Sequence, residues 1–212
     1  MKKADAETRA RLLEAAERLF AERGFKRVTV REICDAARAN VAAVNYHFGD
    51  KLGLYREVLQ GAIDAMRETS RAARAAGEGQ PPEEQLRRFV AVFLERILTA
   101  GSDTVHQLIT REMHDPTPAL DTLVEQGVRP RVEYLCDVVA RLMGCDPRDR
   151  RVLRCVGSIQ AHALVYRPNP IATRLGIAFE PTPEAIAEAA DHIATFSIAG
   201  VRAIAARPDL AR

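Results

Sequence analysis

Residues 25–59 read FKRVTVREICDAARANVAAVNYHFGDKLGLYREVL. Within this stretch Thr29 and Glu32 are three residues apart, which is the spacing of a capping box. In such a box the threonine hydroxyl accepts a hydrogen bond from the glutamate N–H, and the glutamate carboxylate accepts one from the threonine N–H. The pair therefore predicts a helix that begins after Thr29 and runs over about 30–37.

A second short helix is expected directly after the first. Asn40 is a favourable N-cap residue and predicts a helix over about 41–47, which Gly49 and Asp50 end. Asp50 is in turn placed to cap a longer helix that runs to about Ala76. Two short helices joined by a tight turn predict a helix-turn-helix unit, a module that lays its second helix in the major groove of DNA.

Helical patterning continues through the rest of the chain. Residues 6–22 carry an apolar stripe with charged residues on the other faces, and Gly24 is placed to end that helix. Pro130 falls inside a helical pattern and predicts a bend near residues 126–130, because proline removes one hydrogen bond. Further helices are expected over about 83–99, 103–114, 117–143, 147–167 and 183–206. The sequence therefore predicts an all-α fold of about nine or ten helices.

Composition argues against several functional classes. No apolar run approaches the roughly 20 residues of a membrane-spanning helix, and the N-terminus lacks the apolar core of a signal peptide, so we expect a cytoplasmic protein with no membrane partner. The four cysteines form no CxxC pair and no zinc-like spacing, so no metal or cofactor is expected. Because no GxSxG, HExxH or phosphate-binding glycine loop occurs, we do not expect an enzyme.

Positive charge is concentrated near the N-terminus. Residues 1–56 hold twelve Lys and Arg against eight Asp and Glu, a net charge of +4, whereas the whole chain has a net charge of +2. The remainder of the chain therefore has a net charge of −2. This asymmetry favours a phosphate-binding N-terminal segment on a nearly neutral body.

Residues 8–59 resemble the N-terminal domain of the tetracycline-repressor (TetR) family of bacterial transcription regulators. The matching residues are Gly24-Phe25, Thr29-Val30-Arg31-Glu32-Ile33, Ala36-Ala37, Tyr46-His47-Phe48, Lys51 and Leu54. Residues 111–144 and 158–176 resemble the C-terminal domain of one TetR subfamily. The resemblance implies a three-helix helix-turn-helix domain at residues 1–50 and a helical effector-binding and dimerisation domain at residues 51–212.

A double-stranded DNA operator is the partner that the resemblance implies, with the helix over 40–47 in the major groove. Ala42 and Ala43 are small enough to let the backbone approach base edges, and their methyl groups can contact a thymine methyl. The Asn45 carboxamide can form two hydrogen bonds with adenine. Asn40 is interpreted either as a helix cap or as a reader of bases.

Several residues are expected to bind DNA phosphates. Tyr46 and His47 resemble the phosphate-binding pair of the family. Lys51 begins the long helix, where its charge and the helix N-terminus both favour a phosphate, and Thr29 can offer its hydroxyl and N–H to another. The expected DNA-binding residues are Thr29, Arg38, Asn40, Ala42, Ala43, Asn45, Tyr46, His47 and Lys51. Additional backbone or minor-groove contacts are expected from Lys2, Lys3, Lys26 and Arg27.

Arg38 departs from the family pattern, in which glycine fills the turn between the two short helices. Glycine is favoured there because the turn tends toward a left-handed conformation. Arginine in that conformation costs about 1–2 kcal/mol. Two interpretations follow: either the turn differs in geometry, or Arg38 adopts the strained conformation and contacts the DNA backbone.

A homodimer is expected because one helix-turn-helix module contacts few base pairs. The resemblance implies that the helices over 147–167 and 183–206 pair with their symmetry mates, and the alternative is packing within one chain. The candidate interface residues are Val152, Val156, Ile159, Ala163, Tyr166, Ile193, Gly200 and Ile204.

An internal pocket for a small-molecule effector of unknown identity is also implied by the resemblance. Helices over 83–99, 103–114 and 117–143 would line it, and the alternative for each apolar candidate is ordinary core packing. The candidate residues are Phe89, Phe93, Ile97, His106, Leu108, Arg111, Met113, His114 and Tyr134. A buried Arg111 would indicate an anionic effector.

The predicted function is therefore a ligand-responsive transcriptional regulator. Most relatives repress, so we expect a repressor that binds a palindromic operator as a dimer and is released by the effector. The alternatives are a DNA-binding activator and a DNA-binding protein that responds to no effector.

Overall fold

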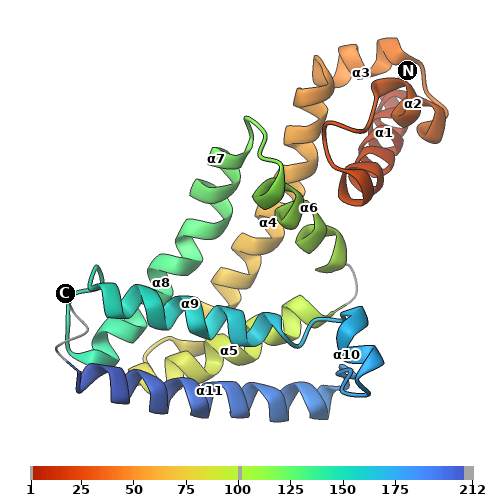
Figure 1. Ribbon diagram of the computed structural model, residues 1–212. Coiled ribbons are helices and arrows are strands. Elements are labelled where there is room, and N and C mark those ends of the chain that lie inside the picture. The colour runs from red at the N-terminus through yellow and green to blue at the C-terminus, as the bar shows by residue number, and fades with distance from the viewer. Residues whose placement is uncertain (1, 100–101, 208–212) are drawn as a thin grey trace. The chain divides into compact units, whose positions relative to one another are not determined.

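The computed structural model describes residues 2–99 and 102–207. These residues form helices joined by turns, with no β-strand among them, as predicted; nine α-helices have eight or more residues and two are shorter. No helix in this part of the chain is long and apolar enough to cross a membrane. In chain order the elements are α1 (Lys2–Arg23), α2 (Val30–Ala37), α3 (Val41–Phe48), α4 (Lys51–Gly77), α5 (Pro82–Leu98), α6 (Ser102–His114), α7 (Leu120–Leu123), a π-helical segment (Val124–Val128), α8 (Arg129–Met143), α9 (Arg150–Leu164), α10 (Pro170–Arg174) and α11 (Pro183–Ala205) (Figure 1).

The chain divides into two compact units. The first comprises residues 1–66 and 101–128, and the second comprises residues 67–100 and 129–212. Helix α4 therefore belongs to the first unit up to Met66 and to the second beyond it. The boundary at residue 50 between a DNA-binding and an effector-binding domain stays a prediction. In the structure, residues 51–66 and 101–128 pack in the same unit as the N-terminal helices.

The core of the first unit is built around aromatic side chains of α1 and α4. The Phe20 ring lies edge-on to the Tyr55 ring with centroids 4.9 Å apart, and the Phe25 ring is 5.0 Å from that of Tyr55. Phe20 and Tyr55 are each at most 1% exposed. Aromatic pairs of this kind stabilise a fold by roughly 0.5–1.5 kcal/mol beyond the burial of their apolar area. The cluster fixes α1 against the start of α4.

Gly24 ends α1, as predicted. Its N–H donates to the Phe20 carbonyl at 2.8 Å, and its φ of 79° lies in the left-handed region that favours glycine. The chain then turns through Phe25 into α2.

The second unit contains helices α5, α8, α9 and α11 around one apolar core. The side chains of Leu86, Val138, Val152 and Ile193, one from each helix, are completely buried. Burial of a Leu, Ile or Val side chain stabilises a fold by about 1.5–3 kcal/mol. The amphipathic patterns that predicted these helices are therefore satisfied within one chain.

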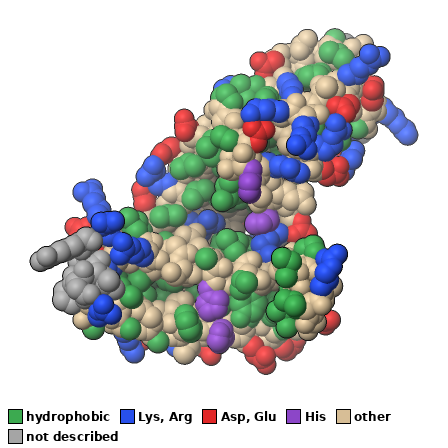
Figure 2. Space-filling view, viewed as in Figure 1, with side chains coloured by type: hydrophobic (Ala, Val, Ile, Leu, Met, Phe, Trp, Pro, Cys, Tyr) green, Lys and Arg blue, Asp and Glu red, His purple; other side chains and the backbone are tan. Residues whose placement is uncertain are grey.

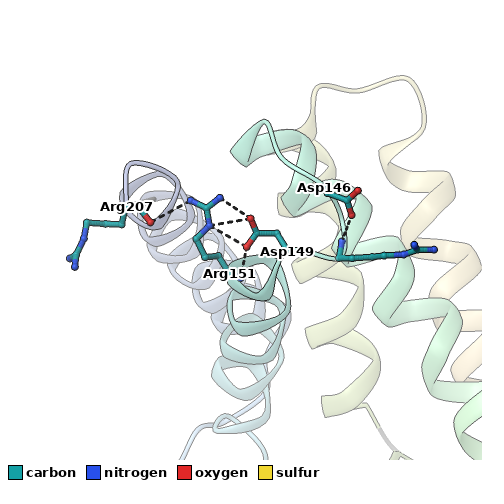
Figure 3. Close-up of polar contacts among 5 residues, drawn as sticks. Asp146, Asp149, Arg151 and Arg207 are labelled. Atoms are coloured by element: carbon teal, nitrogen blue, oxygen red, sulfur yellow. Dashed lines mark hydrogen bonds and ion pairs between the residues drawn. The ribbon is translucent and has the colours of Figure 1, made fainter. Parts of the chain in front are cut away.

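Asp149 and Arg151 join the start of α9 to the end of α11 (Figure 3). The Asp149 carboxylate caps α9 by accepting from the Arg151 N–H at 2.8 Å, and it pairs with the Arg151 guanidinium, also at 2.8 Å. Arg151 Nη1 donates to the carbonyl of Arg207 at 3.4 Å. The hydrogen bonds from Arg151 lower the pKa of Asp149.

The helical pattern over 117–143 is interrupted near the predicted position. A π-helical segment, Val124–Val128, precedes α8, in which Pro130 is the second residue. Gly127 is buried in this segment, where a Cβ atom would lie 3.1 Å from the side chain of Met66. A larger residue at this position would therefore displace Met66.

Candidate nucleic-acid interface

Reciprocal hydrogen bonds between Thr29 and Glu32 begin α2. The Thr29 hydroxyl accepts from the Glu32 N–H at 3.2 Å, and Glu32 Oε2 accepts from the N–H and the hydroxyl of Thr29, both at 2.8 Å. These bonds, chiefly the one from the Thr29 N–H, lower the pKa of Glu32 to about 2. The predicted capping box is confirmed. Both Thr29 groups that we predicted to bind a phosphate are engaged by Glu32, which also pairs with Arg23 at 2.8 Å.

Arg38 adopts the left-handed conformation, with φ 50° and ψ 50°. Among the residues that the structure describes, it is the only one other than glycine with a positive φ. The N–H groups of Arg38 and Ala39 donate to the carbonyls of Asp35 and Cys34, at 3.3 and 2.9 Å, which closes the end of α2. The turn therefore keeps the glycine-type geometry, so the interpretation in which the turn differs is wrong, and the contact of Arg38 with the DNA backbone stays a prediction. Its side chain is exposed.

Helix α3 has one buried face and one exposed face. Val44 is completely buried, and Ala43 is partly buried against the same core. Exposed fractions reach 45% for Val41 and 76% for Tyr46, unusually high for large apolar or aromatic side chains. The exposed residues of α3 are Val41, Ala42, Asn45 and Tyr46. Of the predicted base readers, Ala42 and Asn45 are accessible and Ala43 is half-hidden.

Asn40 is the N-cap residue of α3. Its Oδ1 accepts a hydrogen bond from the Ala42 N–H at 2.9 Å. Of the two interpretations of Asn40, the structure contains the cap. The cap places the first turn of α3 directly after the Arg38 turn.

Tyr46 and His47, predicted as a phosphate-binding pair, occupy different environments. Tyr46 projects outward, whereas the His47 side chain is only 8% exposed and its Nε2 lies 3.4 Å from the carboxylate of Asp5. The two rings contact each other edge-on with centroids 4.9 Å apart. Tyr46 is thus directly accessible to a phosphate, while His47 lies between Tyr46 and α1.

Lys51 is the first residue of α4, as predicted. Its Nζ lies 4.3 Å above the centroid of the Phe25 ring, a cation–π arrangement. Partial burial lowers the pKa of Lys51, because burial disfavours the charged form. The preceding Asp50 caps α4 by accepting from the Gly53 N–H at 2.7 Å. A cation and the N–H groups of a helix N-terminus therefore coincide here, an arrangement suited to an anion.

Further basic side chains surround this module, and Figure 2 shows many Lys and Arg side chains over the N-terminal helices. Arg27 is exposed, whereas Lys26 forms an ion pair with Asp115 at the end of α6. The side chains of Lys2 and Lys3 lie outside the described residues, so their contacts stay a prediction.

Helix α6 holds the helix-turn-helix module through side chains that the sequence did not single out for this role. The Glu112 carboxylate, 1% exposed, accepts from the Tyr55 hydroxyl at 2.6 Å and from the Thr117 N–H at 3.1 Å. Arg111, predicted as a polar contact for an effector, donates instead to the carbonyls of Ala21 and Glu22 at the end of α1. A cation at this end of a helix also interacts favourably with the helix dipole.

The candidate effector residues divide between the two compact units. In the first unit, Leu108 is a core residue with 1% exposure, Met113 is 74% exposed, and the His114 ring lies 2.7 Å from the Thr110 carbonyl. His106 is half-buried in the same unit. Because the candidates come from two separate units, an effector pocket formed by all nine stays a prediction.

Three of the candidates meet in the second unit. The Phe89 and Phe93 rings stack with centroids 5.5 Å apart, and the Phe89 and Tyr134 rings are 6.2 Å apart. Ile97 is partly buried against this core. Arg131 is not among the residues predicted from the sequence, and its guanidinium lies 4.9 Å above the Phe93 ring. Its position one turn before Tyr134 on one helix face is the signal that could have identified it.

Most candidate dimer residues are buried in the core of their own chain. Because five of these side chains are at most 3% exposed, they leave almost no surface for a partner: Val152, Val156, Ile159, Ala163 and Ile193. Tyr166 and Ile204 are partly buried against the same core, and Gly200 is exposed. The packing alternative therefore accounts for these five residues, and the dimer itself stays a prediction.

Comparisons with known families cover both compact units. A model described as "Bacterial regulatory proteins, tetR family" matches residues 12–58. A model described as "HTH-type transcriptional dual regulator CecR, C-terminal domain" matches residues 82–201. Together they include α2, α3 and the whole of α5.

Two curated relatives agree with these models. The HTH-type transcriptional dual regulator CecR of Shigella flexneri is 31% identical over 179 residues, which cover 80% of this chain and 77% of CecR. The HTH-type transcriptional regulator TtgR of Pseudomonas putida is 32% identical over 107 residues, 49% of each chain. Similarity to CecR thus extends through most of both proteins.

Solved structures support the same fold. The TetR-family regulator SCO4454 of Streptomyces coelicolor has a TM-score of 0.63 at 22% identity and covers 93% of this chain and 97% of its own. The ketosteroid regulator KstR2 of Mycobacterium tuberculosis has a TM-score of 0.60 at 20% identity and covers 91% and 97%. The left-handed turn, the exposed face of α3 and the similarity to CecR lead to one conclusion: the chain belongs to the TetR family of bacterial DNA-binding transcription regulators, which are not enzymes.

Proposed function

We propose that this chain is a ligand-responsive repressor that binds a palindromic operator as a homodimer and leaves it when a small-molecule effector binds. The observation that carries the proposal is the exposed face of α3, where Asn45 and Tyr46 project from a helix anchored by the buried Val44. An exposed tyrosine beside an exposed carboxamide suits a DNA surface, because the phenol hydroxyl can donate to a phosphate while the carboxamide reaches a base. Because its target is bacterial DNA, we propose that it acts in the cytoplasm.

We assign base contacts to the exposed side of α3. Asn45 can form two hydrogen bonds with adenine, and Ala42 can pack against a thymine methyl. Ala43 is half-hidden and would contribute by letting the backbone approach the groove. Asn40 would set the start of the helix through its cap to Ala42. Small side chains leave part of the specificity to DNA shape.

Phosphate contacts are assigned to the residues around α3. Tyr46 is exposed, the half-buried Lys51 supplies a cation at the start of α4, and Arg38 is exposed in the turn before α3. His47 would act mainly by supporting Tyr46, since their rings are in contact. Thr29 would bind a phosphate only after its hydrogen bonds to Glu32 are replaced by hydrogen bonds to the phosphate. Each lysine or arginine that neutralises a phosphate makes binding more sensitive to salt.

For the homodimer we propose the exposed side of α9 and α11. A groove of about 250 Å³ runs between these helices, lined by residues that include Ser158, Gly200 and Ile204. Phe196, which lines this groove, is 66% exposed, and Leu153 on α9 is 51% exposed, far more than is usual for such large apolar side chains. A two-fold interface is self-complementary, so this apolar groove can pack against the same groove of a second copy across the axis.

The names of relatives include both repressors and activators of transcription. CecR is described as a dual regulator, KstR2 of Rhodococcus jostii as a repressor and FasR of Mycolicibacterium smegmatis as an activator. Repression is our principal proposal. Activation, or DNA binding that responds to no effector, is the alternative.

Substitution Asn45→Ala tests the DNA-reading assignment. Gel-shift titrations would use fragments of the promoter of the chain's own gene and a set of single base-pair variants of the bound site. Loss of the two adenine bonds should weaken binding by about 1–3 kcal/mol and remove the preference at one A·T pair. Gln107→Ala, a carboxamide on α6, is the matched control and should leave binding unchanged. If no promoter fragment is retarded at low salt, the proposed function is wrong.

A further inference from the structure

Arg131 is a charged side chain in a largely apolar setting, and no described carboxylate forms an ion pair with it. Its Nε is buried, and no described residue accepts a hydrogen bond from it. Burial alone lowers the pKa of Arg131 to about 10, and no carboxylate among the described residues raises it again. At neutral pH the guanidinium therefore remains positive, half-buried on α8.

Other arginines of the second unit show how this fold normally satisfies a guanidinium. Arg74 lies over the Tyr134 ring, like Arg131 over Phe93, but its Nη2 also donates to the Pro130 carbonyl at 3.1 Å. The buried Arg167 donates to the carbonyl of Ile97. Arg131 is left with the Phe93 ring face as its partner among the described residues.

The ring does not compensate for the hydrogen bond that the buried Nε lacks. A cation–π contact stabilises a guanidinium by less than the removal of its charge from water costs. A nearby anion would remove most of that cost and would form charge-assisted hydrogen bonds with the guanidinium. Arginine presents a planar fork that matches the two oxygens of a carboxylate.

Apolar rings lie directly beside this cation. Phe93 stacks on Phe89, and both side chains are at most 3% exposed. The surroundings of Arg131 therefore combine one cationic group with buried aromatic rings. A ligand that matches both must itself carry an anionic group next to an apolar body.

We infer that Arg131 is the anion-binding residue of the effector site, and that the effector is an organic anion with an apolar, ring-containing body. This inference rests on the proposed function and deepens it by naming the chemical class of the effector. It also moves the anionic contact from Arg111, which is bound to main-chain carbonyls of α1, to Arg131.

Two fluorescent probes that differ only in charge test the inference with the full chain. The anion 1-anilinonaphthalene-8-sulfonate and its neutral counterpart N-phenyl-1-naphthylamine share the same rings. Arg131→Met keeps the apolar length of the side chain and removes the charge. It should weaken binding of the anion about ten-fold or more, because charge-assisted bonds are lost, and leave the neutral probe within about two-fold. Arg96→Met, an exposed arginine on α5, should change neither probe.

Thermal unfolding without a probe gives a second readout. If the charge of Arg131 is unpaired when no anion is bound, Arg131→Met should raise the midpoint temperature of unfolding by about 2–4 °C, because it removes that charge. A structural role would predict a lower midpoint. Arg131→Lys keeps a charge and should retain part of the preference for the anion.

Each outcome decides the question. The inference is overturned if the anion fails to bind the natural chain, if it binds Arg131→Met equally well, or if both probes weaken together. Gel shifts with and without the anion separate this result from the proposed function. Operator binding without an Arg131-dependent anion site would defeat the inference alone. An anion site in a chain that never retards promoter DNA would defeat the proposed function alone.

Discussion

The Tyr55 hydroxyl donates a 2.6 Å hydrogen bond to the Glu112 carboxylate, joining α4 to α6 inside the first compact unit. Both residues are 1% exposed. Burial, together with the adjacent Glu112 carboxylate, raises the pKa of Tyr55 far above its usual value, so the phenol remains protonated and able to donate.

Removal of this donor should destabilise the first unit. Tyr55→Phe preserves the ring packing and leaves a buried carboxylate short of one hydrogen bond, which should lower the free energy of unfolding by about 1–3 kcal/mol. Urea denaturation followed by circular dichroism measures the change. Tyr46→Phe, at an exposed position, should change stability by less than about 0.5 kcal/mol. Equal midpoints for the two variants would contradict the role given to the Tyr55 bond.

The capping box should make stability depend on pH. The pKa of Glu32 is about 2 in the folded chain and near 4.5 when unperturbed, so its contribution is complete above pH 4.5 and is lost as the pH falls toward 2. Thr29→Ala removes the cap and should destabilise α2 by about 1 kcal/mol at neutral pH, with a smaller loss of stability between pH 4.5 and 2 than in the natural chain.

Thr182 is a matched control for Thr29. It caps α11 by accepting from the Ala185 N–H, and it is followed at the third position by alanine in place of glutamate. Thr182→Ala should therefore cost a similar amount at neutral pH and leave the acid dependence unchanged. Identical acid profiles for both variants would show that the Thr29 hydroxyl does not help to lower the pKa of Glu32.

Arg38→Gly should relieve backbone strain. Glycine adopts the observed left-handed conformation without a steric penalty, so the variant should be about 1 kcal/mol more stable to urea. If Arg38 also binds a phosphate, the slope of log affinity against log salt should fall by about 0.9 in magnitude. An unchanged slope with increased stability would leave Arg38 as a strained turn residue with no contact to DNA.

Phe196→Glu should disrupt the proposed dimer. A carboxylate at a 66% exposed position is harmless to the monomer, yet it would be buried without a partner in a two-fold interface. Sedimentation velocity at micromolar concentration should change from dimer to monomer. Leu175→Glu has the same 66% exposure but lies outside α9 and α11, and it should remain dimeric. A natural chain that sediments as a monomer would refute the dimer.

Local sequence signals predicted most of the helix-turn-helix module. Thr29, Asn40 and Gly24 act on neighbours within four residues, so their capping roles follow from spacing alone. The geometry of the turn at Arg38 did not follow from spacing. Its left-handed conformation depends on α2 and α3 packing on one core, which overrides the preference of arginine.

Long-range partners could not be predicted in the same way. Arg111 contacts carbonyls some 90 positions earlier in the chain, and Tyr55 bonds Glu112 across 57 positions. The apolar stripe of α9 predicts a dimer face, yet the Val152 and Val156 side chains are buried in the core of their own chain. A helical pattern shows that a face is buried but does not show which helix covers it.

The contacts made by residues 111–115 have a consequence for how the gene can change. Arg111 reaches α1, Glu112 reaches α4 and Asp115 reaches Lys26, all from a single helical turn and the residue beyond it. One residue inserted upstream within α6 would rotate this turn by roughly 100° about the helix axis and break the contacts of Arg111, Glu112 and Asp115 together. Insertions and deletions in α6 should therefore be selected against, whereas the exposed turn at residues 78–81 should tolerate them.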